Sequence, residues 1–220
     1  MSGDHTLVIE AATGRGSAAL IRGLEVVASR EAAMRADDEE RLMPAVAACC
    51  DEAGVAPREL ARVVCGEGPG SFTSLRIAAS IAKGVAAAAG CPVFRVSSLL
   101  LSAAAAAPRA PDGSYLSVLD AHRDELFVLP VRLESGIVEA AGQVRIIAVS
   151  EIAEFASSTR ARTLGPGQEI ESAPDAAAAA LLIPQVIAAG PVDLVSWEPA
   201  YGRAPEAQVR WERQHGRALT

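Results

Sequence analysis

A glycine-rich segment at residues 67–73, with the sequence EGPGSFT, carries the clearest signal for chemistry in this chain of 220 residues. It lies between a predicted buried strand and a long helical run. Backbone N–H groups in such a turn can approach an anion, and the dipole of the following helix adds attraction. The same glycines suit a tight structural turn whose helix is capped by Ser71. The segment therefore predicts either a phosphate or carboxylate site or a turn alone, and it lacks the Gly-Lys-Ser/Thr element of a P-loop.

Two other turns carry polar side chains. In residues 10–17, Glu10 could orient a metal-bound water, although an acid and a hydroxyl there also simply satisfy turn backbone. In residues 120–125 (DAHRDE), His122 lies between carboxylates and could act as a base. No Ser or Cys nucleophile stands beside it, which favours a solvated turn. The three histidines have no metal-binding spacing, so we predict no catalytic residue and no metal site, and a zinc peptidase is disfavoured.

The elements that position these turns follow from local patterns. Apolar runs predict three antiparallel strands, then a helix capped by Asp37 or Asp38 and ended by Gly54. A strand, the glycine-rich turn and a helix over 72–89 ended by Gly90 come next. The expected strands of this half are 6–11, 16–21, 24–30, 61–66 and 93–96, and a helix is expected over 97–107.

The second half repeats this pattern loosely. After a linker at 108–113, strands are expected near 115–119, 126–133 and 142–147, and helices over 150–157, 174–189 and 204–217. We therefore predict a duplicated α/β architecture with subdomains 1–108 and 109–220, and the last helix is predicted to pack back on the N-terminal half.

The helix over 72–89 has only a narrow polar stripe, formed by Thr73, Arg76, Ser80 and Lys83. A helix with so little polar surface needs cover on two faces, and one sheet covers only one. We interpret the remaining face as a contact for another helix or another protein. Its alanines at 78, 79, 82 and 86 are expected to let a second backbone approach closely.

Composition limits the function further. The net charge is −7, and Lys83 is the only lysine among scattered arginines, which argues against a nucleic-acid surface supplied by this chain alone. Alanine-rich stretches are shorter than the roughly 20 residues that span a bilayer, and the N-terminus has no signal-peptide pattern. Cytoplasmic location and four reduced, buried cysteines are therefore expected.

The residues together resemble the TsaB (YeaZ) family, which works in tRNA threonylcarbamoyladenosine synthesis. The match rests on GPGSFTSLRI at 68–77 followed by AKG at 82–84, with support from RLMP at 41–44, LDA at 119–121, GPG at 165–167 and the segment 199–207. It spans about residues 6–210. This chain departs from the family pattern at Glu10 for aspartate, Ser74 for glycine, Asp124 for glycine and Pro166 for a polar residue, and Asp38 stands where many relatives have histidine. Asp tolerates the left-handed backbone that such a turn needs.

The resemblance implies an actin-like fold and a non-catalytic role. It implies pairing with the related transferase TsaD through the first two helices, with the ATPase subunit TsaE joining the pair, a separate enzyme, TsaC, making the threonylcarbamoyl-adenylate, and tRNA reached only through the complex. Without TsaD, the same surface could pair two copies of the chain. The implied interface comprises Arg41, Leu42, Ala45, Val46, Cys49, Phe72, Leu75, Arg76, Ala78, Ala79, Ala82 and Ala86. A vestigial cofactor-binding set comprises Glu10, Thr13, Gly68, Gly70, Ser71 and Thr73, and no bound cofactor is expected.

Two other functions stay open. The first is an actin-fold ATPase or kinase that uses Glu10 and the 68–73 turn. The second, more remote, is a peptidase, a label older descriptions of the wider family carried.

Overall fold

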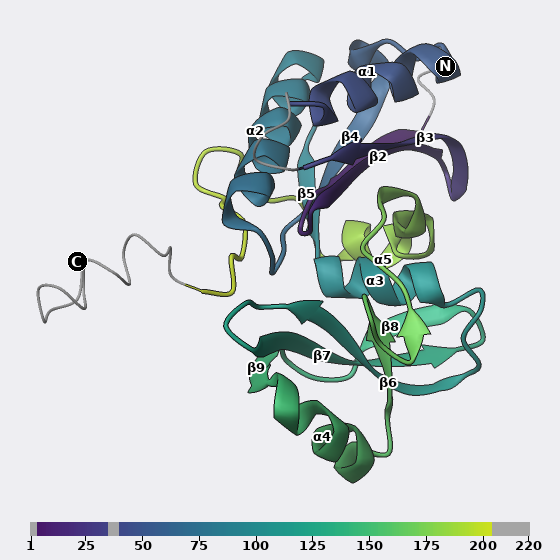
Figure 1. Cartoon of the computed structure of the whole chain (residues 1–220). Coiled ribbons are helices and arrows are strands. Elements are labelled where there is room, and N and C mark those ends of the chain that lie inside the picture. The colour runs from purple at the N-terminus through teal and green to yellow at the C-terminus, as the bar shows by residue number, and fades with distance from the viewer. Residues whose placement is uncertain (1–3, 35–39, 204–220) are drawn as a thin grey trace, which may run out of the picture.

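The computed structural model describes residues 4–34 and 40–203, which form two β-sheets with helices between and outside them (Figure 1). The first sheet has the order β3-β2-β1-β4-β5, in which β1 pairs antiparallel with β2 and parallel with β4. Its strands are β1 (His5–Glu10), β2 (Arg15–Arg22), β3 (Glu25–Ala33), β4 (Leu60–Gly66) and β5 (Val93–Val96). All five were predicted, with ends shifted by at most three residues.

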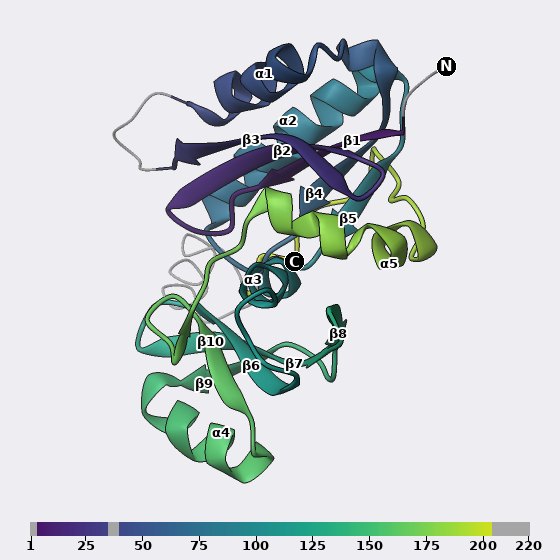
Figure 2. The same ribbon diagram turned by 90° about the vertical axis from the view of Figure 1, so that its right-hand side faces the viewer.

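Both long helices of the first half lie on the outer face of this sheet (Figure 2). Helix α2 (Phe72–Ala89) has the predicted bounds, because Ser71 caps it by accepting from the Ser74 N–H and Gly90 ends it in the left-handed conformation. Helix α1 (Leu42–Ala53) ends at Gly54 as predicted. At its start the Glu40 carboxylate accepts from the Met43 N–H at 2.9 Å, whereas Asp37 and Asp38, the expected caps, lie outside the described residues. A short 3-10 turn, η1 (Pro57–Glu59), leads into β4.

The second sheet has the order β11-β10-β6-β7-β8, with β9 also paired to β7. Its first strand again pairs antiparallel with the next strand and parallel with a later one, so the two sheets share one topology. The predicted duplication is thereby confirmed. The strands are β6 (Gly113–Asp120), β7 (Glu125–Glu134), β8 (Ile137–Ala140), β9 (Arg145–Ala148), β10 (Arg162–Gly165) and β11 (Ile170–Glu171). The sequence patterns missed β8, β10 and β11, which have four residues or fewer.

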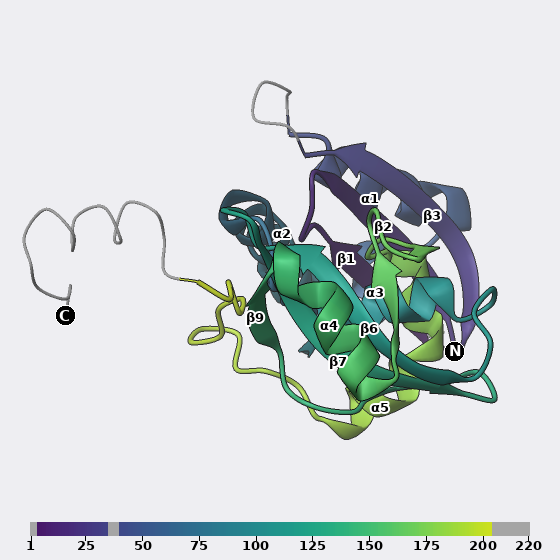
Figure 3. The same cartoon turned by 60° about the horizontal axis from the view of Figure 1, so that its bottom comes forward.

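Of the helices expected in the second half, the one over 150–157 is present with its ends shifted by two residues, and the one over 174–189 is not continuous. Helix α4 (Ile152–Thr159) follows the 3-10 turn η2 (Val149–Glu151) and covers the outer face of the second sheet (Figure 3). The single helix predicted over 174–189 is instead a 3-10 helix, η3 (Ala176–Leu181), followed by α5 (Ile183–Ala188). Pro184, in the first turn of α5, has no N–H to continue a helix from the preceding turn.

Helix α3 (Ser98–Ala106) lies between the two sheets and belongs to one apolar cluster with residues of both halves (Figures 1 and 2). That cluster joins Val64 and Leu99 of the first half to Leu119 and Phe127 of the second. The chain passes from α3 to β6 at the predicted linker. Because the two halves share a core, their division into two subdomains near residue 108 stays a prediction.

Residues 191–203, which we call the strap, run from α5 back across the first half. The Val192 N–H donates to Val93 O at 2.8 Å, and Trp197 is buried in the cluster of the first sheet. The helix predicted over 204–217 lies outside the described residues. Within the described ranges, no helix combines the length and apolar character that crossing a bilayer requires.

Candidate functional site

The glycine-rich turn packs tightly against the first β-turn. The Ser71 N–H donates to Ala12 O at 2.8 Å, and a Cβ on Gly70 would lie 2.2 Å from the same oxygen. The Gly68 N–H donates to the Ser98 hydroxyl at 3.1 Å. Two of the backbone donors expected to face an anion are therefore already bonded within the protein. Gly68 has a φ of +95°, which favours glycine at that position.

Glu10 is buried at the end of β1 beneath this turn, with only 1% of its surface exposed. Its carboxylate accepts from the Ala12 N–H at 2.5 Å and from the Ser98 hydroxyl at 2.8 Å. A Cβ on Gly66 would overlap a Glu10 carboxylate oxygen, so the glycine on β4 makes room for the longer acid. Burial raises the pKa of Glu10 to about 7, against the lowering effect of its hydrogen bonds. This carboxylate does not line any of the hollows described below.

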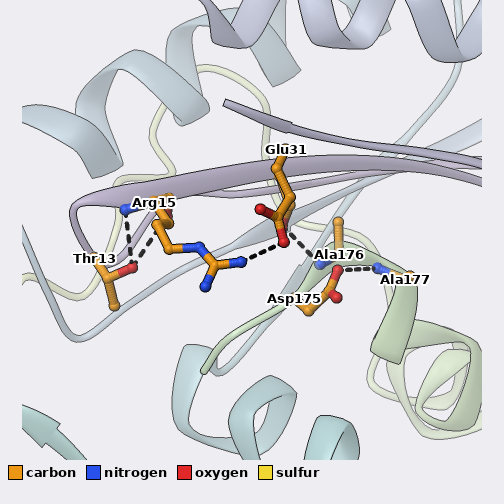
Figure 4. Close-up of polar contacts among 7 residues, drawn as sticks. Thr13, Arg15, Glu31, Asp175, Ala176 and Ala177 are labelled. Atoms are coloured by element: carbon orange, nitrogen blue, oxygen red, sulfur yellow. Dashed lines mark hydrogen bonds and ion pairs between the residues drawn. The ribbon is translucent and has the colours of Figure 1, made fainter. Parts of the chain in front are cut away.

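The entry to η3 lies close to the start of β2, where the Ala176 N–H donates to the Ser17 hydroxyl at 2.9 Å (Figure 4). Thr13 bonds only within its turn, accepting from the Arg15 N–H and donating to Arg15 O. Arg15 forms an ion pair with Glu31, while Asp175 caps η3 by accepting from the Ala177 N–H at 2.9 Å. A hollow of about 320 Å³ lies there, and its arginines are accompanied by three acids, so it has no net positive charge for an anion.

The β6–β7 turn is exposed and left-handed. His122, Arg123 and Asp124 have φ values of 59°, 58° and 57°, so Asp124 adopts the conformation expected of it. Asp120 accepts from the His122 N–H at 2.7 Å, and both side chains are largely exposed. The turn is solvated, as predicted, and the described residues contain no cluster of His, Cys, Asp and Glu that could hold a metal ion.

A cavity of about 750 Å³ opens between the two halves. Its walls are the α2 N-terminal turn (70–73), the β6–β7 turn, Phe127, Ile146 and the strap residues Tyr201 and Arg203. Of the predicted cofactor set, Gly70, Ser71 and Thr73 line the cavity, whereas Glu10, Thr13 and Gly68 do not. Tyr201 and Arg203 were not predicted from the sequence to belong to this site, although both lie in the segment 199–207 that supported the family resemblance.

The strap closes one side of this cavity. The Tyr201 ring packs against Phe72 in a tilted arrangement with ring centroids 4.4 Å apart, and its hydroxyl accepts from Arg76 Nε at 3.1 Å. Arg203 forms an ion pair with Glu125 of the other half. Lys83, the only lysine, donates to Trp197 O at 2.6 Å, so this amine anchors the strap to α2.

The predicted interface residues are mostly inside the chain, and this part of the prediction is wrong about which helix face points outward. The alanine stripe of α2 packs on its own sheet, because small side chains let the sheet approach as closely as they would let another helix. Only Arg41 and Arg76 of the set are exposed, and Phe72 is half-buried. The buried members are Leu42, Ala45, Val46, Cys49, Leu75, Ala78, Ala79, Ala82 and Ala86.

The outward face of the two helices is nevertheless apolar. Ile77, Ile81 and Val85 of α2 are half-buried, and Met43 of α1 is 43% exposed. A hollow of about 490 Å³ lies between α1 and Val85, and another of the same volume follows α2 from Phe72 to Ile81. We call this surface the α1–α2 face. The four cysteines form no disulfide with one another, and Cys49, Cys50 and Cys65 are buried as expected, whereas Cys91 is only partly buried.

Two sheets of one topology that enclose a shared helix and a cavity define an actin-like α/β protein. Two solved structures from Pseudomonas aeruginosa support this fold over nearly the whole chain. YeaZ has a TM-score of 0.73 and 26% identity, covering 90% of this chain and 99% of its own. A protein described as similar to the peptidase YeaZ has a TM-score of 0.75 and 24% identity, covering 91% of this chain and all of its own.

The chain belongs to the TsaD family, whose model, described as tRNA N6-adenosine threonylcarbamoyltransferase, matches residues 31–187. Its curated relatives are tRNA threonylcarbamoyladenosine biosynthesis proteins TsaB. The Bacillus subtilis protein is 32% identical over 121 residues, which are 55% of this chain and 52% of the relative. The Escherichia coli protein is also 32% identical over 121 residues and is covered to 52%. The chain spans about half the length of the curated relatives it matches. The expected TsaB (YeaZ) resemblance is thereby confirmed.

Proposed function

We propose that this chain is a non-catalytic subunit that supports threonylcarbamoyl transfer to tRNA by docking on a TsaD-type transferase through the α1–α2 face. An ATPase of the TsaE type joins the pair, and tRNA is reached through the complex. The observation that carries the proposal is the apolar stripe of Ile77, Ile81 and Val85, which the chain's own fold covers only in part. Contiguous exposed apolar surface of this kind is typical of a protein interface.

The shape of the face supports docking by a helix. Hollows lie on both sides of the α2 stripe, one between the two helices and one beside the N-terminal half of α2. Ser80, which lines the second hollow, and Gly84 are exposed on α2. Their small side chains leave the α2 backbone accessible, so a partner helix can pack at a short distance. The same face would serve a pair of identical chains when the transferase is absent.

The interior position of Glu10 speaks against the ATPase alternative. A metal-orienting acid has to reach solvent or ligand, whereas both Glu10 oxygens accept hydrogen bonds inside the protein. We therefore expect calorimetry with ATP and magnesium to give no one-to-one binding in the micromolar range. Tight binding with turnover that Glu10→Gln abolishes would favour the enzyme.

Gly84→Arg tests the docking face directly. Gly84 is exposed on α2, and a Cβ there meets no atom within 4 Å, so the chain itself accepts a larger side chain. Removing a helical glycine should stabilise the monomer by about 0.5–1 kcal/mol. At a packed interface the same arginine overfills the contact at a cost of about 1–3 kcal/mol. We expect about tenfold to hundredfold weaker binding to the transferase, measured by calorimetry, together with an unchanged or higher melting temperature.

Gly14→Arg is the matched control. Gly14 also has open space around its Cβ position, but it lies in the turn between β1 and β2 and lines neither hollow of the α1–α2 face. This variant should bind the transferase like the unaltered chain and support equal formation of modified tRNA in the reconstituted system. Normal binding by Gly84→Arg would reject the α1–α2 face as the contact.

A further inference from the structure

The end of the strap has a different character from its middle. Trp197 and Pro199 are buried and fix the middle of the strap on the first half. Residues 200–203 beyond them have no regular secondary structure, and Ala200 and Gly202 are exposed. The Ala200 N–H donates a backbone hydrogen bond to Glu67 O at 2.7 Å. Segments with few buried contacts open at low free-energy cost.

Residues 200–203 also touch both halves of the molecule at the cavity. Gly202 lies in close contact with both halves, because a Cβ there would be 2.5 Å from the Phe127 ring and 2.8 Å from Pro69. We call this tight position, between Phe127 and Pro69, the seat of Gly202. On one side Tyr201 packs against Phe72, and on the other Arg203 pairs with Glu125. Tyr201 and Arg203 line the cavity itself. This four-residue segment is therefore a wall of the cavity that surface contacts hold in place.

We propose that residues 200–203 form a gate over the cavity, with Trp197 and Pro199 as its fixed base and the seat of Gly202 as its latch. The other walls are the α2 N-terminal turn, the β6–β7 turn, Phe127 of β7 and Ile146 of β9, and each of these belongs to or adjoins a helix or a strand. The gate adjoins no helix or strand among the described residues of the strap, so we expect it to move before the other walls. Opening it breaks the Tyr201–Arg76 bond and the Arg203–Glu125 ion pair and exposes Phe127. The cavity is within the range of about 300–1,000 Å³ that small-molecule sites occupy.

The gate also connects the cavity with the α1–α2 face. Phe72 and Thr73 line both the cavity and the outer hollow beside α2. Because the Tyr201 ring rests on Phe72, a partner seated in the outer hollow would hold the gate closed. This last consequence rests on the proposed docking function, whereas the gate itself does not.

Gly202→Ala tests the latch, with Gly190→Ala as a matched control. Both glycines have a left-handed backbone, with φ values of +74° and +81°, so an added methyl group strains the two backbones alike. Only at Gly202 does the methyl group also collide with the seat, because a Cβ at Gly190 meets nothing within 4 Å. Hydrogen exchange of the Ala200 amide is expected to be about tenfold faster in Gly202→Ala than in Gly190→Ala. Amides of β1 report global unfolding and should exchange equally in both.

A second pair of variants keeps the test independent of strain at glycine. Tyr201→Ala removes the ring contact with Phe72 and should speed exchange of the Ala200 amide, while Tyr201→Phe retains the ring and should lie close to the unaltered chain. Equal exchange in Gly202→Ala and Gly190→Ala, or in Tyr201→Ala and Tyr201→Phe, would overturn the gate. Slower hydrogen exchange of the Ala200 amide on adding the transferase tests only the coupling between docking and gate closure. Gly84→Arg reports separately whether docking occurs.

Discussion

Replacing Leu75 by aspartate is expected to unfold this chain. Leu75 is fully buried in the cluster shared by both halves, where it packs with Val64 and Leu99. An unpaired carboxylate there loses its hydration and gains no partner, at a cost of several kcal/mol. We expect the free energy of unfolding, measured with urea, to fall by about 4 kcal/mol or more, which is a large share of the roughly 5–15 kcal/mol available to a domain. Ala82→Arg should behave similarly, because Ala82 is also fully buried.

Leu24→Asp is the control for the chemical change. Leu24 is 62% exposed in the turn between β2 and β3, so its substitution should alter stability by no more than about 0.5 kcal/mol. Suppose that Leu75→Asp unfolded cooperatively, with a free energy of unfolding within about 1 kcal/mol of that of the unaltered chain. The Leu75 side chain would then not be buried as the structure places it. Loss of pairing in Leu75→Asp would report unfolding, so this variant cannot test the interface, and outward positions such as Gly84 must do so.

The stability of the chain should fall as pH rises toward neutrality, and Glu10→Gln should abolish this fall. The folded pKa of Glu10 is about 7, above the ordinary value of 4.5, because desolvation outweighs the hydrogen bonds from Ala12 and Ser98, and Asp175 adds a small repulsion. The folded state therefore holds the proton more tightly than the unfolded chain. The stabilisation from this proton is complete below pH 4.5 and is lost as pH rises through about 7. The loss amounts to about 3 kcal/mol.

The glutamine variant can keep one hydrogen bond to each partner of the Glu10 carboxylate, although the bond with Ser98 reverses its direction. Its amide oxygen can accept from the Ala12 N–H, and its NH₂ group can donate to the Ser98 hydroxyl, which already accepts from Gly68. We expect Glu10→Gln to be more stable than the unaltered chain at pH 8 by up to about 3 kcal/mol, with the difference shrinking toward pH 5. Urea unfolding at several pH values measures this. Glu31→Gln, at an exposed acid, should show no such trend, and a pH-independent difference for Glu10→Gln would contradict a buried titrating carboxylate.

The ends of α2 could be predicted because Ser71 and Gly90 are local signals that act within one turn of the helix. Which face of α2 points outward could not be predicted in the same way. One stripe consists of alanines and the other of Ile77, Ile81 and Val85, so both are apolar and periodicity does not distinguish them. The alanine stripe faces the sheet because its small side chains permit close packing there.

The cavity depends on contacts between segments far apart in the chain. The turns at 68–73 and 120–125 were recognised separately, but their meeting at one cavity follows from the stacking of two sheets around α3. Strands β10 and β11 have four and two residues, too few for an alternating pattern, and are held by pairing in order beside β6. The role of Gly66 could not be predicted from sequence either. Only the folded structure shows that a side chain at this position would collide with Glu10.

The duplication of the sheet is incomplete in one respect. Where the first half inserts α2 between its parallel strands, the second half crosses from β10 to β11 through residues 166–169 alone. The molecule is thus pseudo-symmetric in its strands and asymmetric in its outer helices. A chain with such a helix pair on both halves could join neighbours at each end and grow into a filament. With the pair on one half only, self-pairing through the proposed α1–α2 face would end at two chains, so the missing helix would stop polymerisation.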